Sequence, residues 1–435
     1  MILMLTNSFF FKRQTFLFKL NLSNFIYNNI DFFMYFKYDF YKLKEAILFN
    51  TVEVLPTDEE QLDKEIQTLV DHANQTGEPI RHYIGFEISG KLHLGTGIMT
   101  AIKVKKLQDA GVRCSIWLAN YHTWLNNKLD GKIETIRDFN NYYFTPTFKK
   151  CFEVCGCNVG EIDFWSADEL YIGKQINGRH FWDFMMKVAK NLTLARVNKS
   201  VTVTGKQAGE GVEFGVLCYP VMQVADAFFM QTHLVHAGID QRKCHVLMRE
   251  VASKMDEGFE LKLGQNPVKP IAMHHPLLLS LGISVKEVSE RMTTENSESA
   301  KMSKSKPDSA IWVDDSPEEI VRKLKKAYCP LPDPNRQTPE EIEREQEWNP
   351  VLDWCKKMVY PAGKRILLQR PEKFGGDKIF ETFEELKKEY FTGSIHPMDL
   401  KTSLANILAD WFKPIRDFAA QNIEGQKMLE QLNIK

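Results

Sequence analysis

The chain has 435 residues, of which 43% are hydrophobic and 26% are charged, and its formal net charge is −1. These values are ordinary for a globular protein of two or three domains with a large core. They exclude a strongly basic protein that binds nucleic acid through its overall charge, so any such binding surface must be local.

The N-terminal segment 1–50 differs in composition from the rest of the chain. It is rich in Phe, Asn, Lys and Tyr and has no acidic residue before Asp31, while Lys12 and Lys19 interrupt its apolar runs. No stretch reaches the ~20 apolar residues that a membrane helix needs. We interpret the segment as a disordered extension of a cytoplasmic protein without a membrane anchor. The alternatives are an organelle-targeting segment, which is also basic and poor in acid, and a product of starting upstream of Met34.

Strands alternate with helices between residues 51 and 310, which predicts an α/β fold with a Rossmann-like, doubly wound parallel sheet. An amphipathic helix at 58–73 follows a candidate N-cap, Thr57. The other expected elements are strands at 81–89, 112–122, 233–243 and 269–279 and helices at 97–111, 219–229 and 244–255. A mostly helical, aromatic-rich insertion near residues 130–200 interrupts this first domain.

The segment 89–97 reads SGKLHLGTG and lies where the first of these strands leads into a helix. Its glycines let the backbone approach a ligand, and the start of a helix offers free N–H groups to a phosphate. His93 would lie beside those donors. Alone, the pattern is a weak signal, because a structural loop histidine is more common than a catalytic one.

The helix expected at 219–229 is apolar except for one polar stripe. Tyr219, Gln223 and Asp226 follow each other at i, i+4 and i+7, which places them on one face of a helix. This stripe faces either water or something in the interior that requires hydrogen bonds.

A loop rich in Ser, Lys and Glu contains the sequence KMSKS at 301–305. Its lysines, Lys301 and Lys304, would be able to close over a polyphosphate and neutralise the charge that develops on it. A solvated basic linker is the alternative reading of such a pattern.

Strand patterning largely disappears after residue 310. Helical segments at 316–328, 350–360, 382–391 and 397–421 predict a separate all-α domain at 311–435.

The eight cysteines indicate a reduced protein with free thiols. Only Cys151, Cys155 and Cys157 cluster, and their spacing matches neither a zinc ribbon nor a zinc finger. We therefore expect no metal or prosthetic group bound by the protein itself.

Taken together, the His93 turn and the KMSKS loop resemble the HIGH and KMSKS signatures of class I aminoacyl-tRNA synthetases, with Thr96 in place of the last His of HIGH. The resemblance implies an ATP-dependent ligase in which His93, Lys301 and Lys304 are catalytic. It also implies ATP contacts from Gly95, Thr96, Gly97, Met302, Ser303 and Ser305. Mg²⁺ would arrive with ATP as part of the substrate. Thr96 would weaken or reshape one nucleotide contact.

A longer resemblance, from about residue 60 to residue 420, is to tyrosyl-tRNA synthetases of the archaeal and eukaryotic type. The similar segments are YIGFEISGKLHLG, LANYHTWLN, YPVMQVAD, DQRKCHVLMRE, KMSKSKPDSAIWVDDSPEEI, KKAYCP, RPEKFGGD and HPMDLK. This resemblance implies activation of L-tyrosine by ATP to tyrosyl-adenylate and transfer to the 3′ end of tRNA(Tyr). It also implies a homodimer that pairs through the insertion near 130–200.

The resemblance assigns the tyrosine pocket residue by residue. Tyr83 and Asp226 would bind the phenol, whose hydroxyl can donate to a carboxylate and accept from another hydroxyl. The ammonium group would be held by Tyr219, Gln223 and Gln241, and the pocket would also be lined by His122. Phenylalanine would leave the buried carboxylate unpaired, which gives the pocket its selectivity.

On the RNA side, the resemblance implies that Phe374 stacks on an anticodon base and that His396 and Asp399 contact the anticodon. Arg242 and Arg196 would reach the acceptor stem. For a single Phe or Asp considered alone, core packing or helix capping is the alternative.

Two other functions compete with this interpretation. A tryptophanyl-tRNA synthetase would share the fold, but an indole pocket has no need of Asp226 opposite Tyr83. A non-catalytic RNA-binding relative is favoured only by Thr96, whereas the intact His93 and KMSKS lysines argue against it.

Overall fold

A computed structural model of the chain describes residues 37–206, 213–283, 307–333 and 338–434. Its centre is a six-stranded sheet with the strand order β1-β8-β5-β2-β3-β4. The five parallel strands are β2 (Arg81–Phe86), β3 (Arg113–Leu118), β4 (Asp163–Ser166), β5 (Leu234–Gly238) and β8 (Ile271–His275). The edge strand β1 (Glu53–Leu55) pairs with β8 in the antiparallel direction. The predicted doubly wound parallel sheet is confirmed.

The order of the strands determines where a ligand can bind. The chain enters the parallel sheet at β2, proceeds to β3 and β4 on one side, and then crosses to β5 and β8 on the other side. In such sheets, ligands bind beyond the carboxyl ends of the strands, at the point where the order reverses. Here that point lies between β2 and β5.

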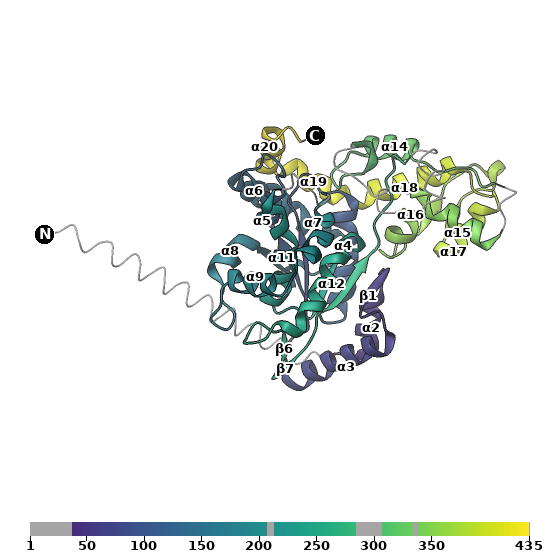
Figure 1. Cartoon of the computed structure of the whole chain (residues 1–435). Helices are drawn as coiled ribbons and strands as arrows, with labels where there is room; N and C mark the ends of the chain where they lie inside the picture. Colours follow the sequence, from purple (N-terminus) through teal and green to yellow (C-terminus); the bar gives the residue numbers. More distant parts are fainter. Residues whose placement is uncertain (1–36, 207–212, 284–306, 334–337, 435) are drawn as a thin grey trace.

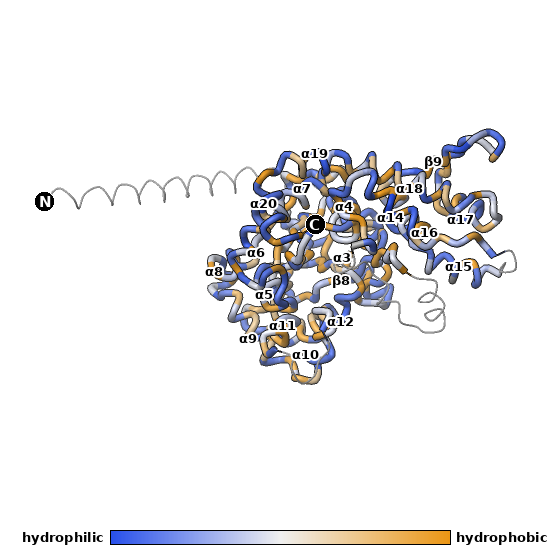
Figure 2. The backbone as a smooth tube through the Cα atoms, turned by 90° about the horizontal axis from the view of Figure 1, so that it is seen from above, coloured by the Kyte–Doolittle hydropathy of each residue, from blue (hydrophilic) through white to orange (hydrophobic). Residues whose placement is uncertain are grey.

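Helices pack around this sheet and build the insertion (Figure 1). They are α3 (Glu59–Thr76), α4 (Leu94–Asp109), α5 (Asn120–Leu125), α6 (Ile133–Phe139), α7 (Thr145–Val154), α8 (Ala167–Gly173), α9 (Phe181–Lys190), α10 (Leu194–Ser200), α11 (Phe214–Phe229) and α12 (Arg242–Val251). A π-helical turn, η1 (Asn140–Phe144), joins α6 to α7, and a small hairpin is formed by β6 (Lys262–Leu263) and β7 (Asn266–Pro267). Most helices carry both polar and apolar residues along the backbone (Figure 2), as expected for helices with one buried side.

Several local predictions differ from the structure. The strands expected at 81–89, 233–243 and 269–279 end earlier, at Phe86, Gly238 and His275, and the helix expected at 219–229 begins earlier, at Phe214. The N-cap of α3 is Asp58, whose side chain accepts a hydrogen bond from the backbone of Gln61, rather than Thr57. The strand expected at 112–122 ends at Leu118 because α5 begins at Asn120. The insertion also contributes the edge strand β4, which its helical pattern did not reveal.

The segment before residue 50 is partly folded, so the prediction of a disordered extension is wrong for residues 37–50. They contain the helix α2 (Phe40–Leu48), and the Tyr38 hydroxyl donates to the carbonyl of Gly111 at 2.9 Å. The buried ammonium of Lys103 donates to the carbonyls of Ala46, Ile47 and Phe49 at 2.7–2.8 Å, and so satisfies the end of α2. The remainder of that prediction, residues 1–36, lies outside the described residues.

The C-terminal part is mainly helical, as predicted. Its helices are α14 (Pro317–Lys326), α15 (Pro339–Glu347), α16 (Pro350–Trp354), α17 (Phe383–Phe391), α18 (Pro397–Trp411), α19 (Lys413–Gln421) and α20 (Ile423–Gln431). A short antiparallel pair, β9 (Ile366–Leu368) and β10 (Lys378–Phe380), interrupts them.

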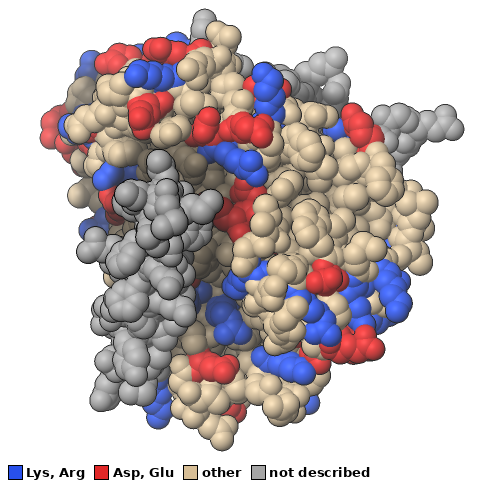
Figure 3. Space-filling model, turned by 90° about the vertical axis from the view of Figure 1, so that its left-hand side faces the viewer, with Lys and Arg blue, Asp and Glu red and all other residues tan. Residues whose placement is uncertain are grey.

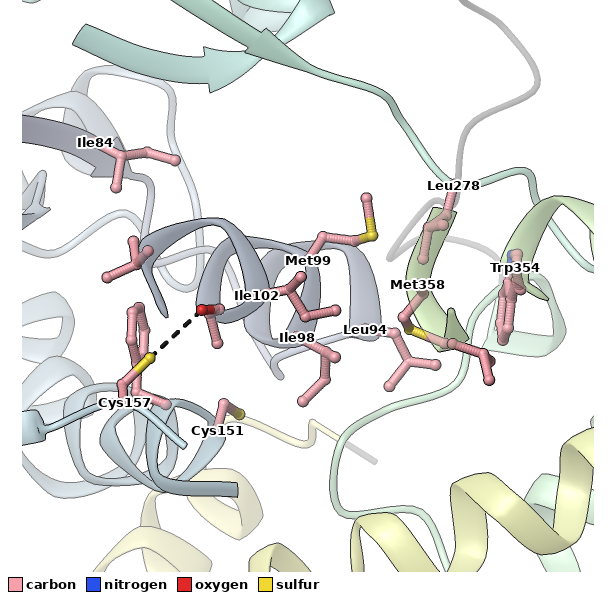
Figure 4. Packing of buried hydrophobic residues seen from close by; sticks show 14 of the residues in the cluster. Ile84, Leu94, Ile98, Met99, Ile102, Cys151, Cys157, Leu278, Trp354 and Met358 are labelled. Carbon is pink, nitrogen blue, oxygen red and sulfur yellow. Dashed lines mark hydrogen bonds between the residues drawn. The ribbon is translucent and has the colours of Figure 1, made fainter. Parts of the chain in front are cut away.

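The hydrophobic core is continuous across residue 310. Leu94 and Ile98 on α4 lie between Cys151 of α7 and Met358, which follows α16 (Figure 4). The Trp411 indole at the end of α18 donates to the backbone carbonyl of Val154 at the end of α7. The helical part is therefore packed against the sheet domain.

Candidate active site

A cavity of about 670 Å³ opens at the carboxyl ends of β2 and β5. It extends from Asp226 on α11 to Gly95 and Thr96 in the first turn of α4. The predicted tyrosine-pocket residues all line this one cavity, namely Tyr83, His122, Tyr219, Gln223, Asp226 and Gln241. The fold therefore brings together five separate segments of the chain at the switch point of the sheet.

The floor of the cavity is the carboxyl group of Asp226, which is 1% exposed. The Tyr171 hydroxyl donates to its Oδ1 at 2.6 Å, and the Tyr83 hydroxyl donates to its Oδ2 at 3.3 Å. The Nε2 atom of His122 lies 3.8 Å from Oδ2. Burial raises the pKa of Asp226 to about 8, and the two tyrosine hydroxyls oppose that rise. Burial likewise lowers the pKa of His122 to about 3, so this imidazole is neutral at pH 7.

Tyr171 is a site residue that the sequence analysis missed. It lies on α8, within the insertion, and its ring stacks on Phe181 with the centroids 3.5 Å apart. The Trp117 ring also packs against Tyr171, with the centroids 5.6 Å apart. Nothing in the local sequence marks Tyr171, because only the packing of α8 on α5, α9 and β4 brings its hydroxyl to Asp226.

The end of the polar stripe away from Asp226, at Gln223 and Tyr219, offers hydrogen-bond acceptors. The amide nitrogen of Gln223 donates to Oε1 of Gln241 at 3.3 Å, and the amide nitrogen of Gln241 donates to the Val203 carbonyl at 3.3 Å. The Gln223 Oε1 atom is buried and makes no hydrogen bond to any described residue. A buried acceptor without a partner is costly unless a ligand donates to it.

Glu87, just beyond the end of β2, is a second residue that the sequence analysis missed. Its carboxylate forms a hydrogen bond with the Tyr219 hydroxyl and accepts another from the Asn126 amide at 2.8 Å. The buried hydroxyl of Tyr219 therefore has a raised pKa, mainly through burial and then through the charge of Glu87. Glu87 thus supplies a carboxylate at this end of the cavity, and the Lys128 ammonium lies 4.0 Å from it.

The start of α4 forms the other end of the cavity. His93 is the N-cap of α4, and its Nδ1 accepts from the Thr96 backbone N–H at 3.3 Å. The Thr96 hydroxyl lies 3.2 Å from Nε2 of the same ring, so Thr96 orients His93. Gly95 lines the cavity, but Gly97 does not, because a Cβ there would lie 3.0 Å from the Cys151 sulfur. Gly97 is therefore packed closely against Cys151 and Val313, and its nucleotide contact stays a prediction.

The residues that follow KMSKS lie beside the His93 turn. The Leu94 N–H donates to the carbonyl of Ile311 at 3.2 Å, and the Val313 N–H donates to the carbonyl of Leu92 at 3.0 Å. The fold therefore brings residues 311–313 to the first signature. The predicted residues Lys301, Met302, Ser303, Lys304 and Ser305 lie outside the described residues.

Five residues were predicted to contact RNA. Three of them are exposed or partly exposed, and the other two form ion pairs with carboxylates of the protein. The Phe374 ring is 62% exposed, His396 is exposed, and Asp399 is half-buried in the first turn of α18. Arg242, however, donates to both carboxylate oxygens of Glu53 at 2.7–2.8 Å, and Arg196 pairs with Glu250. Both arginine charges are thus neutralised within the protein, which the sequence analysis did not foresee.

Within the part of the chain that the structure describes, no group of three His, Cys, Asp or Glu side chains is arranged to hold a metal ion. In the same part, no helix combines the length and the apolar character required to cross a membrane.

Comparison with known proteins identifies the class. Residues 75–413 match the model of the family described as tRNA synthetases, class I (W and Y). A tryptophanyl-tRNA synthetase from Aeropyrum pernix is similar at 18% identity with a TM-score of 0.52, which shows a shared fold alone.

The tyrosine branch is much more similar. The tyrosine–tRNA ligase of Thermococcus kodakarensis is 40% identical over 368 residues, which cover 83% of this chain and 93% of that protein. The crystal structure of the tyrosyl-tRNA synthetase from Pyrococcus horikoshii complexed with L-tyrosine has a TM-score of 0.77 at 38% identity and covers 90% of this chain and all of that one. The chain belongs to the class I tRNA synthetases, among their tyrosine–tRNA ligases. The family predicted from the sequence is confirmed.

Proposed function

We propose that the cavity above Asp226 binds L-tyrosine and ATP for the reaction of a tyrosine–tRNA ligase. The observation that carries this proposal is the buried carboxyl group of Asp226, held by the hydroxyls of Tyr171 and Tyr83 at the floor of the cavity. A substrate phenol there would donate to the carboxyl group and accept from a tyrosine hydroxyl. Phenylalanine cannot do either, and enzymes of this same class reject it by about 10⁵-fold, a figure that belongs to the class and is not calculated from this pocket.

The α-ammonium group of the substrate would bind at the end of the cavity formed by Tyr219, Gln223 and Gln241. The Gln223 Oε1 atom, the Tyr219 hydroxyl and Oε1 of Gln241 are acceptors at that end. The carboxylate of Glu87 adds a negative charge through its hydrogen bond to Tyr219. This arrangement leaves the carboxylate of the substrate to point toward the start of α4.

The chemistry requires alignment and charge stabilisation rather than a covalent nucleophile. The tyrosine carboxylate attacks the α-phosphate of ATP, which arrives with Mg²⁺, and pyrophosphate leaves. The first turn of α4 and His93 would stabilise the phosphates, and Lys301 and Lys304 would neutralise the leaving pyrophosphate. A ribose hydroxyl at the 3′ end of the tRNA then attacks the carbonyl carbon of the adenylate, and AMP leaves.

The anticodon would be read by the exposed Phe374 ring together with His396 and Asp399. An exposed aromatic ring offers a surface on which an unpaired base can stack. Arg242 and Arg196 would meet the acceptor stem only by exchanging their pairs with Glu53 and Glu250 for phosphates.

The insertion side of the molecule supports a homodimer. Large apolar side chains are exposed there, namely Ile172, Trp182, Met186 and Leu194. The face on which α8 and α9 lie has a broad area of uncharged residues (Figure 3), as expected of an interface between copies. Light scattering should give twice the mass of the chain at micromolar concentration, and Met186→Glu should give a monomer; a monomeric wild type would refute this part of the proposal.

We place the reaction in the cytoplasm, with no membrane partner. A fusion of residues 1–50 to a fluorescent protein tests this location, because import into an organelle would contradict it.

Tyrosine-dependent exchange of pyrophosphate into ATP tests the proposed function directly. We expect exchange with tyrosine and none with tryptophan or phenylalanine. Exchange with tryptophan alone would support the tryptophanyl alternative, and no exchange with any amino acid would support a non-catalytic RNA-binding protein.

A further inference from the structure

A single guanidinium joins the loop that carries Phe374 to the start of α18. The Nε atom of Arg370 donates to the carbonyl of Gly376 at 3.1 Å, and its Nη1 atom donates to the carbonyl of Ser394 at 2.8 Å. The Arg370 backbone N–H also donates to Oδ1 of Asp377 at 3.0 Å, which closes the loop at its base. Two segments that are far apart in sequence are thus tied by one side chain.

The loop is shaped around this guanidinium. Gly375 and Gly376 both adopt positive φ, at 99° and 68°. A Cβ atom on Gly375 would lie 3.1 Å from Nη2 of Arg370. The Phe374 ring itself is 62% exposed, and its neighbour Lys373 places Nζ 4.9 Å from the ring centroid. The ring is therefore presented to solvent by a backbone that Arg370 holds.

The other end of the link lies two residues before His396. The carbonyl of Ser394 accepts a hydrogen bond from Arg370. The next residue, Ile395, is fully buried and precedes His396. His396 is the N-cap of α18, and its Nδ1 accepts from the Met398 N–H at 3.2 Å. Arg370 thereby sets the position of the Phe374 loop relative to the N-terminus of α18.

We propose that Arg370 is a positioning residue for anticodon recognition, which holds the Phe374 ring in register with His396 and Asp399. The inference rests on the proposed function, in which these three residues meet the anticodon. A planar guanidinium can bond two carbonyls in a fixed fork, whereas a lysine ammonium at this position cannot reproduce both directions. Because the ring is fixed before RNA arrives, less conformational freedom is lost on binding.

The test is aminoacylation of tRNA by Arg370→Ala, compared with exchange of pyrophosphate into ATP. We expect the KM for tRNA to rise about tenfold, the low end of the effect expected for the loss of one hydrogen bond to a charged donor. The exchange reaction, which needs no tRNA, should stay within about twofold. The matched control is Arg365→Ala, which removes an exposed arginine paired with Glu381 near the same hairpin and should leave both reactions within about twofold.

A double-mutant cycle distinguishes positioning from direct contact with RNA. If Arg370 acts by holding the ring, Arg370→Ala should raise the KM for tRNA by less than about twofold when Phe374 is already replaced by Ala. If the increases in KM of the two single variants multiply in the double variant, the inference is overturned, because Arg370 would then act independently of the ring. Arg370→Lys should recover part of the loss, and it serves in place of Arg370→Ala should the alanine variant melt at a much lower temperature.

The failures of the two proposals can be told apart. If Phe374→Ala leaves the KM for tRNA unchanged, the proposed anticodon contact is wrong, and the inference falls with it. If Phe374→Ala raises KM while Arg370→Ala does not, only the inference is overturned.

Discussion

Replacing Asp226 by Asn should impair tyrosine activation while preserving the shape of the pocket. In the structure, Asp226 accepts hydrogen bonds from Tyr171 at 2.6 Å and from Tyr83 at 3.3 Å. The amide nitrogen of Asn accepts no hydrogen bond, so one hydroxyl of the protein or of the substrate loses its acceptor in a buried site. Such a loss costs about 1–3 kcal/mol, which corresponds to a fall of about 5-fold to 150-fold in kcat/KM for tyrosine.

The assay is exchange of pyrophosphate into ATP at varied tyrosine and varied ATP. The KM for ATP should change by less than about twofold, because the start of α4 lies at the other end of the cavity. A suitable control is Asp163→Asn, which removes a carboxylate paired with Arg113 at 2.8 Å outside the cavity. The control should leave both KM values unchanged.

The reasoning would be refuted by either of two results. Equal losses for tyrosine and for ATP would mean that Asp226 supports the structure of α11 in general. An unchanged kcat/KM for tyrosine would mean that the phenol does not bind at Asp226.

Three further predictions concern the pKa of Asp226, the hydroxyl of Tyr171 and the ammonium of Lys103. First, burial raises the pKa of Asp226 from 3.8 to about 8, so between about pH 4 and pH 8 the folded state binds more protons than the unfolded state. Stability should therefore fall as pH rises through this window, by up to about 1.4 kcal/mol per pH unit, and Asp226→Asn should lack this component. Urea unfolding of both proteins at pH 5, 6 and 7 measures it, and parallel curves would contradict it. Second, Tyr171→Phe should raise the KM for tyrosine about fivefold, because Asp226 loses its shorter hydrogen bond; an unchanged KM in the exchange assay would show that Tyr171 has no part in the site. Third, Lys103→Met should lower the free energy of unfolding by about 3 kcal/mol, because the carbonyls of Ala46, Ile47 and Phe49 lose their donor. A loss below about 1 kcal/mol in urea would indicate that α2 contributes little to the fold.

Much of the fold and part of the site were determined by short-range patterns in the sequence. The 3.6-residue period placed Tyr219, Gln223 and Asp226 on one face, and all three line the cavity. The strand, the glycine-containing turn and the helix around His93 were likewise visible, because periodicity and capping act over only a few residues.

The hydrogen bonds and ion pairs between side chains distant in sequence were decided only by the tertiary structure. Tyr171 meets Asp226 across 55 positions of sequence, and Lys103 reaches back to the end of α2. Arg242 pairs with Glu53 because β1 adds to the sheet beside β8, which no local pattern reveals. The polar stripe on α11 showed that something required hydrogen bonds, but which groups supply them depends on the packing of helices against the sheet. That packing is set by contacts between residues distant in sequence.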